Sequence, residues 1–318
     1  MDKTIIALGL MSGTSMDGID ASLIRTDGEK NIEIIGNFYL KYDLELKNSL
    51  YDFCYKINNL RDIDLNKNQL ETIERKITIL HAEASTIICK KYNIKPSLVG
   101  LHGQTILHNP KEKCSIQLGN AKLLSQLLKK DVVYQFRKND ILNGGEGAPL
   151  TPIYHHNLAR KLNINNPIVF LNIGGIANFT YSNNQDFFAK DVGPGNCLMD
   201  SYLKKTKKLE YDKDGMLASS GNIDNTLINN ILDNEYYNTI KKHSFDIKDF
   251  DINFVRGLST EDALANLNLL TAKIIANNLK KEINDNFIII LCGGGRKNKT
   301  LVENLKNLIN KKIINIDD

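Results

Sequence analysis

Residues 9–20 combine the residue types that bind phosphates and divalent cations: glycine, serine, threonine and the carboxylates of Asp17 and Asp20. Apolar runs on either side, at residues 4–10 and 21–24, predict two strands joined by this turn. The backbone N–H groups and hydroxyls of such a turn can surround a phosphate, and the carboxylates can approach a magnesium ion. An ordinary glycine-rich hairpin uses the same residue types, because glycine, serine and aspartate are common in turns. These residues alone leave both interpretations open.

A second motif, Asp-Val-Gly-Pro-Gly-Asn at residues 191–196, lies between a predicted strand and a helix predicted to begin near Cys197. Its glycines allow the backbone to approach a ligand, and the N-terminus of the helix attracts anions. Asp191 stands at the strand end, where a carboxylate could take a proton from a nucleophile during phosphoryl transfer. Considered alone, an aspartate before such a turn is more often a turn or capping residue.

Three consecutive glycines, Gly293, Gly294 and Gly295, follow the apolar run at residues 287–291. Residues without side chains can lie flat against an adenine or a ribose. The same pattern is typical of a flexible connection to a helix, here with Asn298 as its N-cap.

A polar group of residue types follows the short strand predicted at residues 98–101. His102, Gln104 and Thr105 offer an imidazole, an amide and a hydroxyl to a hydroxyl-rich ligand. Arg137 adds a fork-shaped guanidinium that could pair with a substrate carboxylate. The alternatives are a hydrogen-bonded loop histidine and a surface ion pair.

The spacing of histidine and cysteine argues against a metal centre built from these residues. His155 and His156 are adjacent, and neighbouring residues on a helix point apart, which predicts surface placement. The five cysteines are odd in number and lack a Cys-x-x-Cys pair, so neither a zinc site nor a disulfide framework is expected. We therefore expect reduced, mostly buried thiols.

The elements that must position these motifs form two halves with a similar layout. The first half continues with a third strand at 31–39, helices at 44–58, 67–92 and 121–128, and short strands at 98–101, 114–117 and 131–135. The second half has strands at 168–173, 179–182 and 187–192, a Gly174-Gly175 turn, helices at 259–282 and 298–308, and a buried strand at 287–291. This echo predicts an α/β protein of two lobes, residues 1–132 and 133–318, with glycine-bearing turns facing each other across a cleft that suits nucleotide phosphates.

Length and composition support this organisation and exclude some classes of function. A chain of 318 residues suggests about two domains, and 42% hydrophobic residues are enough to fill their cores. The net charge of +4 comes from 41 basic and 37 acidic residues spread along the chain, which does not favour nucleic-acid binding. The chain has no apolar run approaching the roughly 20 residues of a membrane helix and no signal-peptide pattern, so no membrane association and a cytoplasmic location are expected.

Six motifs occur in one order that identifies a family. They are residues 13–20, 102–105, 144–150, 172–178, 191–196 and 292–295. In this order they resemble the anhydro-N-acetylmuramic acid kinase family, from near the first residue to about Asn298. The resemblance implies the two-lobed actin-like (ribonuclease H-like) ATPase fold, each lobe a mixed sheet flanked by helices with nucleotide in the cleft. It also implies ATP and Mg²⁺, an amino-sugar substrate, a homodimer and a role in peptidoglycan recycling.

The reaction implied by the resemblance is unusual. Such enzymes hydrolyse the internal 1,6-anhydro bond of 1,6-anhydro-N-acetylmuramic acid and phosphorylate the released 6-oxygen, which gives N-acetylmuramic acid 6-phosphate. By similarity, Asp191 is the base that activates the water attacking the anomeric carbon. Because the leaving oxygen is captured by phosphorus, the reaction needs less of the general acid that an inverting glycosidase must supply.

The resemblance also assigns roles to individual residues. Asp17 and Asp20 would position the magnesium, directly or through water, and Arg137 would meet the lactyl carboxylate of the sugar. The residues expected to bind ATP are Gly13, Thr14, Ser15, Met16, Asp17, Gly18, Ile19, Asp20, Gly174, Gly175, Gly193, Gly195, Asn196, Gly293, Gly294 and Gly295. The residues expected to contact the sugar are His102, Gln104, Thr105, Arg137 and Asn178.

The match to the family is expected to fail at the C-terminal end. Family members continue past the triple glycine with a strand, a turn carrying a glutamate that reaches the sugar, and a final helix, whereas this sequence ends at Asp318. This pattern predicts a truncated member. The alternatives are an inactive relic or weak nucleotide-binding module, and a kinase for another anhydro sugar. Arg137 favours a substrate that carries a carboxylate.

Overall fold

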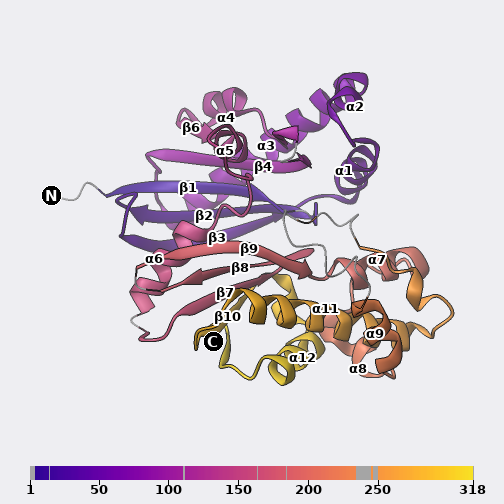
Figure 1. Ribbon diagram of the computed structural model, residues 1–318. Coiled ribbons are helices and arrows are strands. Elements are labelled where there is room, and N and C mark those ends of the chain that lie inside the picture. Colours follow the sequence, from indigo (N-terminus) through magenta and orange to yellow (C-terminus); the bar gives the residue numbers. More distant parts are fainter. Residues whose placement is uncertain are drawn as a thin grey trace. The chain divides into compact units, whose positions relative to one another are not determined.

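The computed structural model describes residues 4–13, 15–109, 112–162, 164–183, 185–233, 245 and 250–317. The chain divides into two compact units, Met1–Leu150 and Thr151–Asp318 (Figure 1). Each unit has its own hydrophobic core. Among the described residues, no helix is both long and apolar enough to cross a bilayer.

The first unit is built on a mixed sheet that opens with an antiparallel meander. The meander strands are β1 (Ile5–Ser12), β2 (Gly18–Thr26) and β3 (Ile32–Lys41). The long strand β4 (Leu98–Asn109) runs parallel to β1, while β5 (Cys114–Leu118) and β6 (Asp131–Tyr134) both pair with β4. The meander predicted from the apolar runs is therefore present, and the turn between β1 and β2 lies at residues 13–17.

Five helices accompany this sheet in the first unit. They are α1 (Leu44–Lys56), α2 (Leu60–Leu65), α3 (Lys67–Tyr92), α4 (Ala121–Leu128) and α5 (Phe136–Leu142). Helix α3 buries one face against the sheet, where Ile77 and Ile88 have no exposed surface. Asn93 ends α3 in the left-handed conformation, with φ of 53°, which asparagine adopts more easily than most residues.

The second unit repeats the strand order of the first. An antiparallel meander of β7 (Ile168–Ile173), β8 (Ile176–Ser182) and β9 (Phe187–Pro194) is followed by β10 (Ile288–Cys292), parallel to β7, and β11 (Ile313–Asn315), parallel to β10. The order β9-β8-β7-β10-β11 thus corresponds to β3-β2-β1-β4-β6. The α/β class and the repeated layout expected from the sequence are confirmed.

The main helices of the second unit pack on this sheet and on one another. They are α6 (Pro152–Leu162), α7 (Cys197–Thr206), α8 (Met216–Ser219), α9 (Asn225–Leu232), α11 (Thr260–Glu282) and α12 (Lys299–Ile309). Helix α11 is the most deeply buried, with Leu264, Leu267 and Leu270 all at 0% exposure. Ser259 caps its N-terminus by accepting the N–H of Asp262.

Along the chain, the boundary between the two compact units falls between residues 150 and 151, whereas the lobe boundary predicted from the sequence follows residue 132. The difference arises because β6 pairs with β4 and α5 packs on β5. Residues 133–150 therefore belong to the first unit in this structure.

The adjacent histidines of α6 are buried, so the predicted surface placement is wrong. His155 and His156 are 9% and 7% exposed. Their Nδ1 atoms lie 2.8 and 2.9 Å from the hydroxyls of Thr180 and Ser182, which point to the same face of β8. The His155 ring also stacks on Phe170, with centroids 4.7 Å apart. Helix α6 packs on β8, and both imidazole rings contact side chains of this strand.

Candidate active site

The turn between β1 and β2 carries most of the residues expected to bind ATP. The N–H of Met16 donates to the carbonyl of Gly13 at 3.1 Å, and Met16 adopts a positive φ of 54°. The Ser15 hydroxyl donates to Asp17 Oδ1 at 2.5 Å. Thr14 lies outside the described residues. Gly18 and Ile19 are buried at the start of β2 and Asp20 follows them, so the turn presents the carboxylates of Asp17 and Asp20 close together.

Two residues from outside this turn hold it in place, one through its side chain and one through its backbone N–H. Gln104 of β4 is fully buried, and its Nε2 donates to the Gly13 carbonyl at 3.1 Å. Tyr42, which follows β3, donates its N–H to the carbonyl of Asp17 at 2.8 Å, and its hydroxyl lies 2.7 Å from the Ser12 hydroxyl. Gln104 was expected to contact the sugar, but the structure places it beneath the turn.

The electrostatics around the two carboxylates suit a cation. Burial first, and then the charge of Asp17, raises the pKa of Asp20. Burial and the Asp17 carboxylate also raise the pKa of Tyr39, which therefore stays a neutral donor. Across the described residues, no group of three or more histidine, cysteine, aspartate or glutamate side chains could hold a metal ion. A pair of carboxylates fits Mg²⁺, which binds through one or two carboxylates together with phosphates and water.

His102 and Arg137 come together in the first unit. His102 is the extra residue of a β-bulge, because Leu101 pairs with Leu10 and Gly103 with Met11. The residues at 102–105 therefore lie within β4 and not in a loop after a short strand. The Nε of Arg137 donates to His102 Nε2 at 2.9 Å, and His102 Nδ1 lies 2.8 Å from the Gly103 carbonyl.

These two hydrogen bonds define the state of the imidazole. Since Nε2 accepts from Arg137, the ring is neutral and carries its proton on Nδ1. Burial and the Arg137 charge lower the pKa of His102 to about 4. Arg137 Nη1 also donates to the carbonyl of Gly147 at 2.7 Å, and Asp140 Oδ2 accepts the Gly147 N–H at 2.7 Å. The motif at residues 144–150 is thus fixed to α5, and His102 with Arg137 forms a rigid pair. Thr105 accepts a longer bond from Gln117, at 3.3 Å.

The two glycine turns of the second unit are joined by backbone hydrogen bonds. The N–H groups of Gly195 and Cys197 donate to Gly175 at 2.9 and 3.1 Å, and the N–H of Asn196 donates to Gly174 at 2.8 Å. A side chain at Gly195 would lie 2.2 Å from the Gly174 carbonyl oxygen, so this approach requires glycine. The N-terminus of the helix that begins near Cys197 was expected to attract anions, and in this structure these three amides donate to the neighbouring turn.

The triple glycine packs against the end of β7. A Cβ at Gly293 would lie 2.5 Å from Asn172 Oδ1, and a Cβ at Gly295 would lie 2.3 Å from Ile173 Cγ2. A Cβ at Gly294 would have no atom within 4 Å. Packing therefore explains the outer glycines, and Gly294 alone leaves open space beside the backbone.

Asp191 lies on β9, directly opposite Asn178 of β8. A register shift follows, because Ala177 pairs with Gly193, so Val192 is the bulged residue next to Asp191. The Oδ2 of Asp191 accepts the backbone N–H of Phe245 at 2.9 Å. Gly193 has a φ of 143°, and a Cβ there would lie 2.6 Å from Ile274 of α11. The bulge and the packing of Gly193 set the direction in which Asp191 leaves the strand.

Comparison with known proteins decides the family. The family described as anhydro-N-acetylmuramic acid kinase matches residues 5–317. The chain is 47% identical over 321 residues to the anhydro-N-acetylmuramic acid kinase of Pelagibacter ubique, with 98% of this chain and 86% of the relative covered. It is 37% identical over 309 residues to the enzyme of that name from Rhodopseudomonas palustris (strain ATCC BAA-98 / CGA009), with 95% of this chain and 84% of the relative covered. The chain belongs to the anhydro-N-acetylmuramic acid kinase family.

Among solved structures, the activator of the 2-hydroxyisocaproyl-CoA dehydratase from Clostridium difficile matches this kinase chain with a TM-score of 0.44 and 12% identity. That match covers 99% of this chain and 88% of the activator.

Some residues that shape the site of this kinase were not predicted. Tyr42 and Tyr39 belong to the third strand region, and nothing in their spacing points to the turn that they contact. Asp140 had a usable signal, because it lies three residues after Arg137 on a helix, where side chains share a face. Its contact with Gly147 shows that the two residues hold one loop between them.

Proposed function

We propose that the protein is an ATP-dependent kinase that hydrolyses the 1,6-anhydro bond of 1,6-anhydro-N-acetylmuramic acid and phosphorylates the 6-oxygen. The observation that carries this proposal is the 47% identity to a relative of that name over 98% of the chain. The product would be N-acetylmuramic acid 6-phosphate, which suits the recycling of peptidoglycan fragments.

Asp191 is the proposed base for the attacking water. It lies within β9 beside a bulge, and Asn178 lies next to it across the strands. The N–H of Phe245 stabilises the ionised carboxylate, which is the form that can accept a proton.

The turn at residues 13–20 is proposed to contact the phosphates of ATP, and Gly294 the adenosine. Backbone N–H groups of the turn are the proposed donors, the Ser15 hydroxyl orients Asp17, and Gln104 keeps the turn in position from below. Asp17 and Asp20 would hold Mg²⁺, which neutralises phosphate charge in phosphoryl transfer. We therefore assign Gln104 to the support of the phosphate turn.

His102 and Arg137 are proposed to meet the sugar. Two hydrogen bonds hold the guanidinium in a fixed plane, toward His102 and the Gly147 carbonyl. A guanidinium oriented in this way is suited to the lactyl carboxylate, because arginine pairs with carboxylates in a planar geometry. The hydroxyl of Thr105 would serve the sugar hydroxyls, and His102, whose two ring nitrogens bond to Arg137 and Gly103, would orient the guanidinium beside the sugar.

The location and assembly of the enzyme are proposed on more general grounds. ATP as phosphoryl donor favours the cytoplasm, and a homodimer is the commonest assembly of enzymes of this size. Light scattering during gel filtration measures the assembly, and a monomeric mass would contradict it.

One experiment tests the reaction as a whole. The purified chain is incubated with ATP, Mg²⁺ and 1,6-anhydro-N-acetylmuramic acid in ¹⁸O-labelled water, and ADP and sugar products are measured by mass spectrometry. We expect equal amounts of ADP and N-acetylmuramic acid 6-phosphate, with the label at the anomeric carbon. Unlabelled phosphosugar would contradict attack by water, and ADP without phosphosugar would contradict the kinase. N-acetylmuramic acid as the control substrate tests whether the anhydro bond is required.

A further inference from the structure

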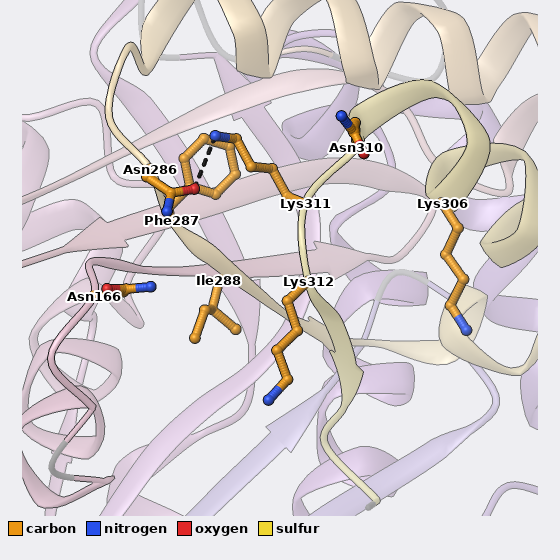
Figure 2. Close-up of a pocket in the computed structure, with 8 residues that line it drawn as sticks. All are labelled: Asn166, Asn286, Phe287, Ile288, Lys306, Asn310, Lys311 and Lys312. Carbon is orange, nitrogen blue, oxygen red and sulfur yellow. Dashed lines mark hydrogen bonds between the residues drawn. The ribbon is translucent and has the colours of Figure 1, made fainter.

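A cavity lined by lysine and asparagine side chains lies at one edge of the second sheet. Its volume is about 430 Å³, and Phe287 and Ile288 line it beside three lysines and three asparagines (Figure 2). Ile288 is the first residue of β10, and Lys312 directly precedes β11. The glycine turns follow the opposite, carboxyl ends of β7 and β10. The cavity is therefore separated from those turns by the length of the strands.

Every ionisable side chain that lines this cavity is basic: Lys306, Lys311 and Lys312. Within the described part of the chain, none of the three takes part in an ion pair. Ammonium groups that share one cavity repel one another, and a bound anion relieves that repulsion. The charge of the cavity thus favours an anionic ligand.

One of these cations is held in place before any ligand arrives. Lys311 Nζ donates to Asn286 Oδ1 at 3.0 Å and lies 5.4 Å from the centre of the buried Phe287 ring. Lys306 lies in the last turn of α12, and Lys312 precedes β11. Figure 2 shows their side chains extending away from Lys311. One ammonium is therefore held by two contacts, whereas those of Lys306 and Lys312 are on exposed side chains.

A smaller cavity of about 250 Å³ adjoins the first and shares Asn166 with it. Ile168 of this cavity pairs in register with Ile288 of the larger one, so the two are neighbours on the sheet. Its polar side chains are neutral and include Asn165, Asn183 and Gln185. Amides donate and accept hydrogen bonds, as sugar hydroxyls do.

We propose that the two cavities bind a phosphorylated sugar, with its phosphate at the lysines and its hydroxyls at the amides. A phosphate monoester carries a charge of about −1.5 to −2 at pH 7, which matches three ammonium groups better than a single carboxylate does. Because the cavities lie at the opposite end of the strands from the glycine turns, the ligand binds without displacing nucleotide. The site is independent of the proposed phosphotransfer reaction.

Calorimetric titration of the whole chain tests this site, with saturating ADP and Mg²⁺ present to fill the proposed nucleotide site. Glucose 6-phosphate is the probe, with glucose and inorganic phosphate as comparisons. We expect glucose 6-phosphate to bind at least tenfold more tightly than either. The double variant Lys306→Gln/Lys312→Gln should lose at least tenfold in affinity for it.

Lys280→Gln/Lys281→Gln is the matched control, because these lysines are exposed in the last turn of another helix of the same unit. It should bind glucose 6-phosphate as the unaltered chain does. Equal affinity in the two double variants would overturn the proposal, as would binding of glucose as tight as that of its phosphate. Inorganic phosphate binding as tightly as glucose 6-phosphate would overturn the part played by the amides. Circular dichroism of each variant confirms that it is folded.

Discussion

Asp191 is the residue on which the proposed chemistry depends. Asparagine has the same shape and can still accept the Phe245 N–H, but it cannot take a proton from water. We expect Asp191→Asn to bind ATP and the sugar within about threefold of the unaltered chain and to lose about 10²- to 10⁴-fold in kcat. Calorimetry and coupled ADP release measure the two quantities. Turnover within tenfold of the original would mean that another group is the base.

Substitution of Gln104 distinguishes support of the turn at residues 13–17 from direct contact with the sugar. Its Nε2 bonds to Gly13, and within the described residues its buried Oε1 has no hydrogen-bond partner. Gln104→Met keeps the length of the side chain and removes the bond to the turn. We expect the KM for ATP to rise at least fivefold, with the KM for the sugar unchanged. A rise in the sugar KM alone would restore the direct sugar contact first predicted for this residue. Thr105→Val is the contrasting variant, since the Thr105 hydroxyl bonds to Gln117 and is proposed to serve the sugar: it should raise the KM for the sugar and leave the KM for ATP unchanged.

At the scale of elements, two of the three consecutive glycines between β10 and α12 should respond differently to substitution. Gly294→Ala should leave the melting temperature unchanged, because nothing lies within 4 Å of its Cβ position, and should raise the KM for ATP. Gly295→Ala should lower the melting temperature, because its Cβ would collide with Ile173. Thermal unfolding and steady-state kinetics measure both. An unchanged KM for ATP in Gly294→Ala would remove this glycine from the nucleotide site.

The meander strands and the longest helices could be predicted from the sequence, whereas short elements such as α2, α9 and β11, and the contacts between elements, were not. Apolar runs predicted both meanders, and helix periodicity predicted α3 and α4 with the bounds that the structure shows. The bulges beside His102 and Asp191 were not predicted, because a bulge depends on pairing with a strand distant in sequence. The burial of His155 was missed for the same reason, since its partner Thr180 lies on another element.

At the scale of the whole molecule, two units with the same strand order carry their proposed functional residues at different strands. In the first unit the proposed phosphate-binding turn joins β1 to β2, and the pair of His102 and Arg137 draws on β4 and α5. In the second unit Asp191 lies on β9, and the glycine turns gather at the ends of β7 and β10. The sequence could indicate this division from the order of its motifs, because each motif follows a predicted strand.

Buried neutral histidines in both units predict how the stability of the molecule depends on pH. Burial lowers the pKa of His81 and His155 to about 4, and burial with Arg137 lowers that of His102 to about 4, against 6.5 for an exposed histidine. Between these values the unfolded chain binds protons that the folded chain does not. The contribution of these histidines to the free energy of unfolding should therefore be constant above pH 6.5 and fall as the pH drops toward 4, by up to about 1.4 kcal/mol per pH unit for each histidine.

Denaturant unfolding at pH 7 and pH 5 measures this loss, and His155→Gln isolates one contribution to it. Glutamine can bond to Thr180 but does not titrate, so the variant should lose about 2 kcal/mol less than the unaltered chain between the two pH values. The difference between the two proteins isolates His155, because His81 and His102, which lie in the first unit, contribute equally to both. The same loss in both proteins would show that His155 is protonated in the folded state, and its contact with Thr180 would then have to involve an imidazolium.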